Sequence, residues 1–185
     1  MGWRYRIWQL RQLLAAEALS AETTQAIQAI LSPAEWQLFL RLRPSDQWHS
    51  YRVLTLLQQA GQTQPGLLTA ALLHDVGKTC VRLSVADRCL IVLATKLWPK
   101  RARRWGNALP MTPDPAWLTS RPFGWRTPFV VKAQHPAWSA ALAAEAGSAP
   151  DAVALIRQHQ VEEIDSAESH LLPLLRRLQW ADDQS

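Results

Sequence analysis

The sequence predicts an all-α protein, a single-domain helical bundle, and two observations support this prediction. Segments with apolar residues at helical spacing follow one another along most of the chain, whereas no alternating pattern of useful length indicates a strand. Residues 128–133 (PFVVKA) come nearest to one. A chain of 185 residues, 48% hydrophobic and 19% charged, is also long enough to bury one globular core.

Two helices are expected in the first part of the chain. Residues 4–19 (RYRIWQLRQLLAAEAL) have apolar residues at helical spacing. Residues 32–42 (SPAEWQLFLRL) begin with Ser32 as N-cap, Pro33 at the first helical position and Glu35 three residues after the cap. That pattern is typical of a capping box, in which the cap and the third helical residue each bond the other's backbone amide.

Two further helices are expected before residue 80. The first covers residues 45–61, with Ser45 or Asp46 as its N-cap and Gly61 as its end. The second begins after Pro65 and ends at Gly77 (PGLLTAALLHDVG). It is apolar on nearly every side, as expected of a helix at the centre of a bundle.

Four more helices are expected after residue 80. The first is capped by Ser84, and the last contains Pro173, which is expected to kink it. All four have apolar residues at the spacing of one helix face. Their ranges are 84–98, 135–147, 151–160 and 166–183.

The positive charge of the chain is concentrated in one segment, from Lys96 to Lys132. This segment has eight basic residues and a single acid, Asp114, so it carries +7, whereas the net charge of the whole chain is +5. It also holds six of the 12 prolines and four of the 10 tryptophans. Its main part, about residues 98–130, is too rich in proline for one regular element, and we expect a long functional insertion there.

Within this segment, residues 96–105 (KLWPKRARRW) interleave five cations with two tryptophans. Such a composition suits weak contact with an anionic membrane surface or stacking on single-stranded nucleic acid. Two other interpretations stay open. The segment is either a solvated loop whose tryptophans pack on the body of the protein, or a lid that brings arginines to a substrate phosphate.

The sequence favours a cytoplasmic location, with peripheral membrane contact as an addition. Cys80 and Cys89 form no CxxC pair and are too few for a disulfide scaffold, so reduced thiols are expected. The N-terminus, MGWRYRIWQLRQLL, lacks the apolar core and the cleavage site of a signal peptide. The apolar run CLIVLA at 89–94 is far too short for a membrane span.

The stretch LLHDVGK at 72–78 ends an apolar helix with a histidine beside an aspartate. Burying such a pair costs free energy unless another group compensates the polar atoms, and a metal ion is the obvious one. His74 and Asp75 therefore predict a metal site. Because adjacent residues point about 100° apart on a helix, the ion is expected off the helix end, where Asp75 can reach two metals.

Further histidines and an aspartate follow at similar intervals. The steps from His49 to His74, from His135 to His159, and from there to Asp182 are nearly equal, each close to one helix plus one turn. The step between His74 and His135 is much longer because it contains the basic segment. Consecutive antiparallel helices can each project one ligand to a shared level of a bundle. Imidazole and carboxylate ligands together suit Mn, Fe, Co, Ni or Zn, with Mg as a further option.

These residues resemble the HD-domain metal-dependent phosphohydrolase superfamily, which is named after its His-Asp doublet. The resemblance extends from Asp46 to Asp183 and is interrupted by the basic segment. It implies one metal held by an upstream histidine, the doublet and a distal aspartate, and a second metal in members with two further histidines. The matching positions are His49, His74, Asp75, His135, His159 and Asp182, with Asp183 as the alternative to Asp182.

The resemblance also implies a domain division, and several features depart from the family pattern. Residues 1–44 are expected to be N-terminal helices packed on an HD domain at 45–185. Residues 135–147 are similar to the family's HPxxGAxxAxxxG stretch, with Ser139 where glycine is usual. The paired histidine of many two-metal members is His159-Gln160 here, and the GYP signature of the cyclic-di-GMP phosphodiesterase branch is absent.

The function implied by this resemblance is hydrolysis of a phosphate ester, of a nucleotide or a related small molecule. Asp75 and Lys78 are the expected catalytic residues, and Lys78 would contact a phosphoryl oxygen unless it only complements the helix C-terminus. Arg52, one turn after His49, would touch phosphate or lie at the surface. The second hypothesis, which Gln160 favours, is a metal-bound scaffold that binds a nucleotide or a protein partner with little or no turnover.

Overall fold

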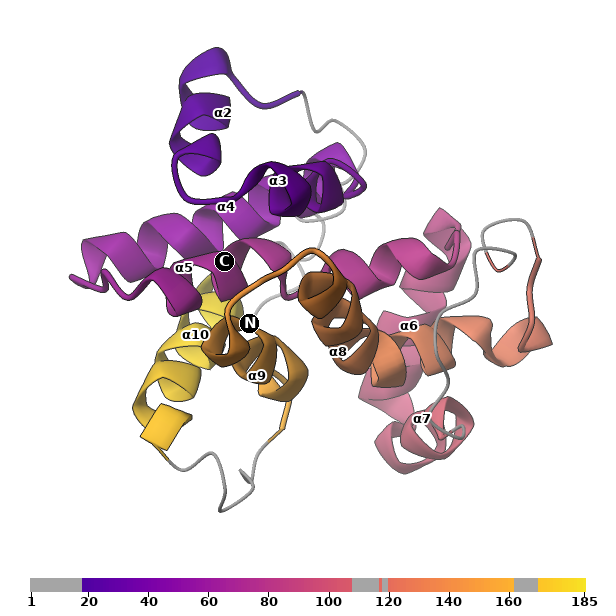
Figure 1. The fold of residues 1–185 in the computed structure, drawn as a ribbon. Coiled ribbons are helices and arrows are strands. Elements are labelled where there is room, and N and C mark those ends of the chain that lie inside the picture. Colours follow the sequence, from indigo (N-terminus) through magenta and orange to yellow (C-terminus); the bar gives the residue numbers. More distant parts are fainter. Residues whose placement is uncertain (1–17, 108–116, 118–119, 162–169) are drawn as a thin grey trace.

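The computed structural model describes residues 18–107, 117, 120–161 and 170–185, and these residues form an all-helical structure without strands (Figure 1). The all-α class predicted from the sequence is therefore confirmed. The α-helices are α2 (Ala21–Gln28), α3 (Pro33–Phe39), α4 (Pro44–Gln59), α5 (Pro65–Leu73), α6 (Val85–Leu97), α7 (Pro99–Gly106), α8 (Thr127–Glu145), α9 (Pro150–Gln158) and α10 (Leu172–Gln184). Two 3-10 helices, η1 (Val76–Cys80) and η3 (Gly124–Arg126), interrupt them.

The first helices agree in part with the expected ones. Residues 4–17 of the first expected helix lie outside the described residues, and the sequence reading missed α2. The capping box of α3 is present as predicted, because the Ser32 side chain accepts from the Glu35 amide and the Glu35 carboxylate accepts from the Ser32 amide. The expected cap of α4 is wrong, since the helix begins at Pro44 with Arg43 as N-cap.

The central helix is shorter than the expected one. α5 ends at Leu73 with His74 as its C-cap, and Asp75 then leads into η1. The expected α-helix to Gly77 is therefore wrong over its last turn. His74 and Asp75 thus lie at the junction between α5 and η1, and this position matters for the site described below.

The last helices differ from the expected ones at their starts, and proline is the reason in both. α8 begins at Thr127 rather than at His135, with Pro128 in its first turn and Pro136 in its interior. α10 begins at Leu172, so Pro173 lies in its first turn, where it is tolerated, and the expected kink is wrong. Ser84 caps α6 as predicted, and Asp87 completes a capping box that was not predicted.

The basic segment contains more regular structure than expected. α7, η3 and the first turns of α8 all fall between Lys96 and Lys132. Residues 108–116 and 118–119 lie outside the described residues. Residues 99–106 and 127–130, which the sequence reading placed in one irregular insertion, are therefore helical.

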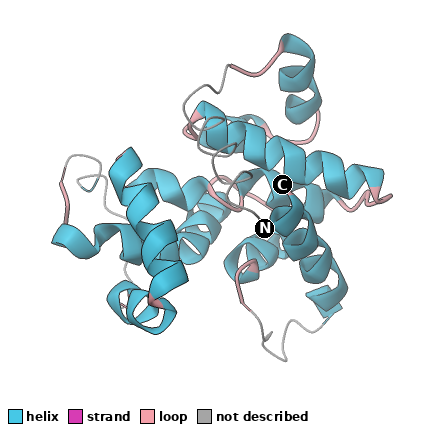
Figure 2. Ribbon diagram, turned by 180° about the vertical axis from the view of Figure 1, so that it is seen from behind, coloured by secondary structure: helices cyan, strands magenta, loops and turns pink. Residues whose placement is uncertain are grey.

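The main hydrophobic core lies around α5, whose side chains at Leu67, Ala70, Leu72 and Leu73 are fully buried. α4, α9 and α10 pack against this helix, and α2 and α3 contribute to the same core. Figures 1 and 2 show that α6 and α7 form a separate end of the molecule, away from α2 and α10. Among the described helices, none is both long and apolar enough to cross a bilayer.

Candidate metal centre

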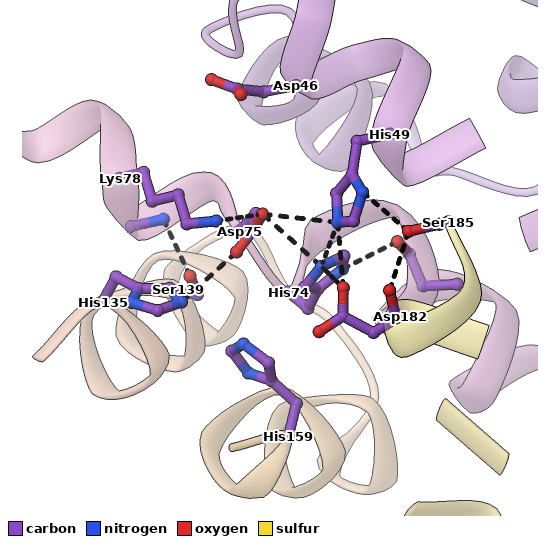
Figure 3. Close-up of polar contacts among 12 residues, drawn as sticks. Asp46, His49, His74, Asp75, Lys78, His135, Ser139, His159, Asp182 and Ser185 are labelled. Atoms are coloured by element: carbon purple, nitrogen blue, oxygen red, sulfur yellow. Dashed lines mark hydrogen bonds and ion pairs between the residues drawn. The ribbon is translucent and has the colours of Figure 1, made fainter. Parts of the chain in front are cut away.

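Six side chains from five parts of the chain meet beside the end of α5 (Figure 3). They fall into two groups of three, and within each group the ligand atoms all lie within 4.8 Å of one another. The first group is His49, His74 and Asp182, and the second is Asp75, His135 and His159. The structure thus brings together all the residues that the sequence indicated as metal ligands.

The first group joins α4, the end of α5 and α10. The Nε2 atom of His49 lies 3.0 Å from Oδ1 of Asp182 and 3.3 Å from Nε2 of His74. The same Asp182 oxygen lies 3.6 Å from Nε2 of His74. Asp182 therefore faces the two histidines, whereas the competing Asp183 is exposed.

The second group is more deeply buried. Oδ1 of Asp75 lies 3.3 Å from Nε2 of His135, which α8 contributes. The ring of His159, from the end of α9, lies 5.2 Å from that of His135 and 5.1 Å from that of His74, measured between ring centroids. All three residues of this group are buried.

Asp75 connects the two groups through its two carboxylate oxygens. Oδ1 faces His135, while Oδ2 lies 3.6 Å from Nε2 of His74 and 3.7 Å from Nε2 of His49. A carboxylate with one oxygen toward each group could serve as a ligand for both, if each group held a metal ion. The turn from α5 into η1 produces this arrangement, because it aims Asp75 between the groups while His74 stays on the first.

The three buried histidines are held in the same tautomer. Nδ1 of His74 lies 3.0 Å from the carbonyl oxygen of Ala71, and Nδ1 of His159 lies 2.7 Å from that of Ile156. His135 makes the equivalent bond of 2.9 Å to Lys132. Because a carbonyl oxygen only accepts, each Nδ1 donates to it, and each Nε2 is left turned toward the centre as the atom that could bind a metal.

Burial and neighbouring charges keep His135, His159 and Asp75 in the forms that bind metals, whereas Asp75 and Asp182 raise the pKa of His74 against the effect of its burial. Burial lowers the pKa of His159 to about 3, and burial also lowers the pKa of His135, so both imidazoles are neutral. Burial alone would raise the pKa of the Asp75 carboxyl, but Lys78 and His74 outweigh it and hold that pKa well below its usual range. Asp75 is therefore ionised.

The donor set fits a divalent metal. Four imidazoles and two carboxylates are the ligands that first-row transition metals prefer. His159 is the strongest indication that these residues fit a metal ion, because its Nε2 atom is buried and has no hydrogen-bond partner. Buried polar atoms are nearly always satisfied, so an orphaned nitrogen aimed at a cluster of carboxylates and imidazoles is what a metal ligand requires. These residues could therefore hold a metal ion.

Two residues that sequence reasoning missed position Asp75 against His135. A Cβ atom on Gly77 would lie 2.7 Å from the amide nitrogen of Ser139 and even closer to the carbonyl oxygen of His135. The Gly77 amide donates a 2.8 Å hydrogen bond to the Ser139 hydroxyl. Only glycine permits this approach of η1 to α8. A sequence signal for Ser139 existed, because it lies one helical turn after His135.

Pro136 also acts on the site, through the carbonyl of Lys132. In a regular helix the Lys132 carbonyl would accept a hydrogen bond from the amide of residue 136. Proline at this position has no amide hydrogen, so the carbonyl is left without that bond. The Nδ1 atom of His135 donates to that carbonyl instead. A proline that is usually unfavourable inside a helix thus leaves an acceptor that orients a metal ligand.

Replacing Pro136 with alanine is expected to weaken metal binding about tenfold, the lower end of the loss typical for an outer-shell partner. The new amide would compete with His135 for the Lys132 carbonyl, while the helix itself would gain stability because alanine is the better helix former. Titration calorimetry with Mn²⁺ or Zn²⁺ and thermal unfolding of the metal-free protein measure the two effects. Unchanged affinity would contradict the role given to Pro136.

The other residues singled out from the sequence lie around this cluster. Nζ of Lys78 lies 2.5 Å from Oδ2 of Asp75, with about a third of its side chain (34%) exposed. Arg52 is half-buried on α4 and belongs to neither group. The Gln160 amide nitrogen lies 3.4 Å from Nε2 of His135. The roles of Lys78 and Arg52 toward a substrate stay predictions.

Comparisons with known proteins do not assign this chain to a family, so the geometry of the site is the main basis for inferring its function. The HD-domain resemblance rests on the doublet, the spaced histidines and the distal aspartate, and family membership stays a prediction. No protein-family model, curated protein or solved structure matches the chain.

Proposed function

We propose that this protein is a metal-dependent phosphohydrolase of the HD-domain type, acting on a phosphate ester of a nucleotide or a related small molecule. The observation that supports this proposal best is the position of Asp75. One buried carboxylate presents an oxygen to each of two groups of metal-ligating side chains. Such paired sites are typical of enzymes that displace a phosphoryl group in line.

The residues proposed to hold the metals are the two groups defined above, with Asp75 shared between them. The mixture of imidazole and carboxylate favours Mn, Fe, Co, Ni or Zn over Ca, and Mg is a further option. When bound, such ions lower the pKa of a water and stabilise the charge that develops on phosphate oxygens.

Lys78 is proposed to meet the phosphate. Burial would lower the pKa of its ammonium, but Asp75 outweighs that effect and raises it, so Lys78 stays protonated. Its side chain is held on Asp75 yet is partly open to solvent. A cation in that position can contact a phosphoryl oxygen while still neutralising Asp75. Arg52, one turn after His49 on α4, is the second candidate for phosphate contact.

The test combines metal content with turnover. Metal analysis of the purified protein should find one or two transition-metal ions per chain. The protein should then hydrolyse at least one member of a panel of phosphomonoesters, phosphodiesters and nucleotides, and a chelator should abolish this hydrolysis. A protein that takes up no metal when supplied with Mn²⁺, Fe²⁺ or Zn²⁺ would refute the metal site.

The alternative is a metal-bound scaffold that binds a nucleotide or a protein partner with little turnover. Gln160 favours it, because its amide nitrogen lies within 3.4 Å of the His135 lone pair that a second metal would need. Metal binding and thermal stabilisation by nucleotides, without hydrolysis of any of them, would support this alternative over the enzyme.

Replacing Gln160 with histidine is expected to raise metal content toward two ions per chain. The substitution removes the amide that competes for His135 and adds an imidazole ligand beside the second group. Metal analysis after loading with Mn²⁺ measures the change. The matched control is Gln158→His on α9, two residues away, where no gain is expected. Equal metal content in the wild type and in Q160H would contradict the idea that Gln160 weakens metal binding at the group of Asp75, His135 and His159.

A further inference from the structure

The outer face of α6 is apolar, although it faces solvent. Leu90, Leu93 and Leu97 follow one another at helical spacing and are 43%, 54% and 53% exposed. Val92 and Trp98 extend this stripe at its edge and at its end, and both are exposed. A helix on the surface of a bundle in water normally turns its polar side outward, so this arrangement calls for a partner.

The helix that follows is strongly basic. Lys96 lies on α6 beside Leu93 and Leu97, and α7 adds four more exposed cations: Lys100, Arg101, Arg103 and Arg104. From Arg88 to Gly106 the sequence contains no acidic residue. Arg88 pairs with Asp46. By contrast, Lys96 and the four cations of α7 form no ion pair within the part of the chain that the structure describes.

The basic helix is firmly seated and is not a loose loop. A Cβ atom on Gly106 would lie 2.6 Å from the carbonyl oxygen of Phe129, so α7 and α8 are in close backbone contact. Arg126 donates to the carbonyl oxygens of Trp105 and Asn107, at 2.9 and 2.8 Å, and so closes the end of α7. α6 and α7 also pack on each other, so the stripe and the cations lie on adjoining helices.

We propose that this surface, formed by the exposed residues of α6 and α7, docks the protein on an anionic membrane. Aliphatic side chains flanked by cations match the interior and the headgroups of such a bilayer. Trp98, between α6 and α7, and Trp125, which lies on η3 against Trp105 of α7 and is 60% exposed, are aromatic residues of the kind that favour the boundary between the two. Single-stranded nucleic acid matches the charge and could stack on the tryptophans, but it would leave the aliphatic stripe of α6 without a partner.

Vesicle flotation tests the proposal with the full-length protein. We expect binding to vesicles of phosphatidylcholine and phosphatidylserine at low salt, weaker binding at high salt, and little binding to phosphatidylcholine alone. Arg101→Glu/Arg104→Glu should lower the binding roughly 25-fold or more. Leu93→Ser/Leu97→Ser should lower it about tenfold, because the apolar contact is lost.

Matched controls separate docking from general effects of charge and hydrophobicity. Arg157→Glu/Arg177→Glu makes the same change of charge on exposed residues of α9 and α10. Leu40→Ser/Val161→Ser removes two exposed apolar side chains elsewhere. Both controls should bind vesicles within about twofold of the wild type, allowing for long-range charge effects screened beyond a Debye length. All variants should unfold at a temperature close to that of the wild type.

A dye attached to Cys89 would report membrane contact directly, without a variant that weakens binding. It is exposed on α6 next to Leu90, whereas Cys80 is only half-exposed and burial raises the pKa of its thiol to about 11. An environment-sensitive dye should therefore react first with Cys89. Its emission should shift to the blue on anionic vesicles, and the same dye at Gln184→Cys, in a variant without Cys89, should not shift.

Three results would overturn the proposal. The first is failure of the wild type to float with anionic vesicles at low salt. The second is full binding by Leu93→Ser/Leu97→Ser with no dye shift at Cys89, which would leave only a diffuse charge effect. The third is tight binding of single-stranded oligonucleotides that displaces the vesicles and depends on the arginines but not on the leucines, which would make the surface a nucleic-acid site.

Discussion

Replacing Asp75 with asparagine should remove the response of the protein to metal. Asparagine keeps the volume of the buried side chain but removes the charge that both ligand groups share. At a metal concentration of 100 times Kd, the wild type should gain about 2.7 kcal/mol of stability. This gain corresponds to a rise in Tm of about 5–10 °C for a chain of this size. D75N should show no such rise, and its turnover should fall by more than about 100-fold.

The control for this experiment is Asp183→Asn, which makes the same chemical change at an exposed position next to Asp182. It should keep both the metal content and the shift in Tm. The helical circular dichroism of D75N should match that of the wild type, since the helices do not depend on this carboxylate. Equal metal content in D75N and the wild type would show that Asp75 is not a ligand.

Replacing Gly77 with alanine should have the largest effect on folding. The new Cβ would meet two backbone atoms of α8, the Ser139 nitrogen at 2.7 Å and the His135 oxygen at a still shorter distance. Backbone cannot rotate away as a side chain can, so η1 and α8 must separate. We expect a loss of about 3 kcal/mol or more from the free energy of unfolding. Because Asp75 and His135 would move apart, the second metal should also be lost.

Ser139→Ala separates this steric effect from the loss of a hydrogen bond. It leaves the buried Gly77 amide without its acceptor but adds no atom, so the expected cost is about 1–3 kcal/mol. Urea denaturation of both variants gives the two free energies, and metal analysis of the folded fraction gives the metal content. A G77A protein as stable as the wild type would show that η1 and α8 are not in close contact.

The sequence indicated the metal ligands because several are chemically costly residues in an apolar setting, and the others follow them at similar spacing. His74 and Asp75 at the end of an apolar helix, and His135 and His159 on other apolar stripes, have no local explanation. Their common purpose could be inferred from residue type and spacing. Their distances could not, because the convergence of α4, α5, α8, α9 and α10 on one point depends on packing between helices far apart in the chain.

Prolines mark where sequence reasoning went wrong. Pro44 and Pro173 lie in the first turns of α4 and α10, and Pro136 lies inside α8. A proline is compatible with the start of a helix and with an interior position whose freed carbonyl finds another donor. At Pro136 that donor is the ring of the neighbouring His135, which the general rules for proline in helices do not take into account.

The sequence alone determined the helical class, the capping box at Ser32, the N-cap at Ser84 and the candidate ligands except for the choice between Asp182 and Asp183, because periodicity, capping and the cost of burying polar groups are local or depend only on composition. The tertiary structure decided three other properties. It divided the ligands into two groups around Asp75, it required glycine at position 77, and it turned the leucines of α6 outward beside the cations of α7. Each of these depends on which helices pack together, and contacts between distant segments set that packing.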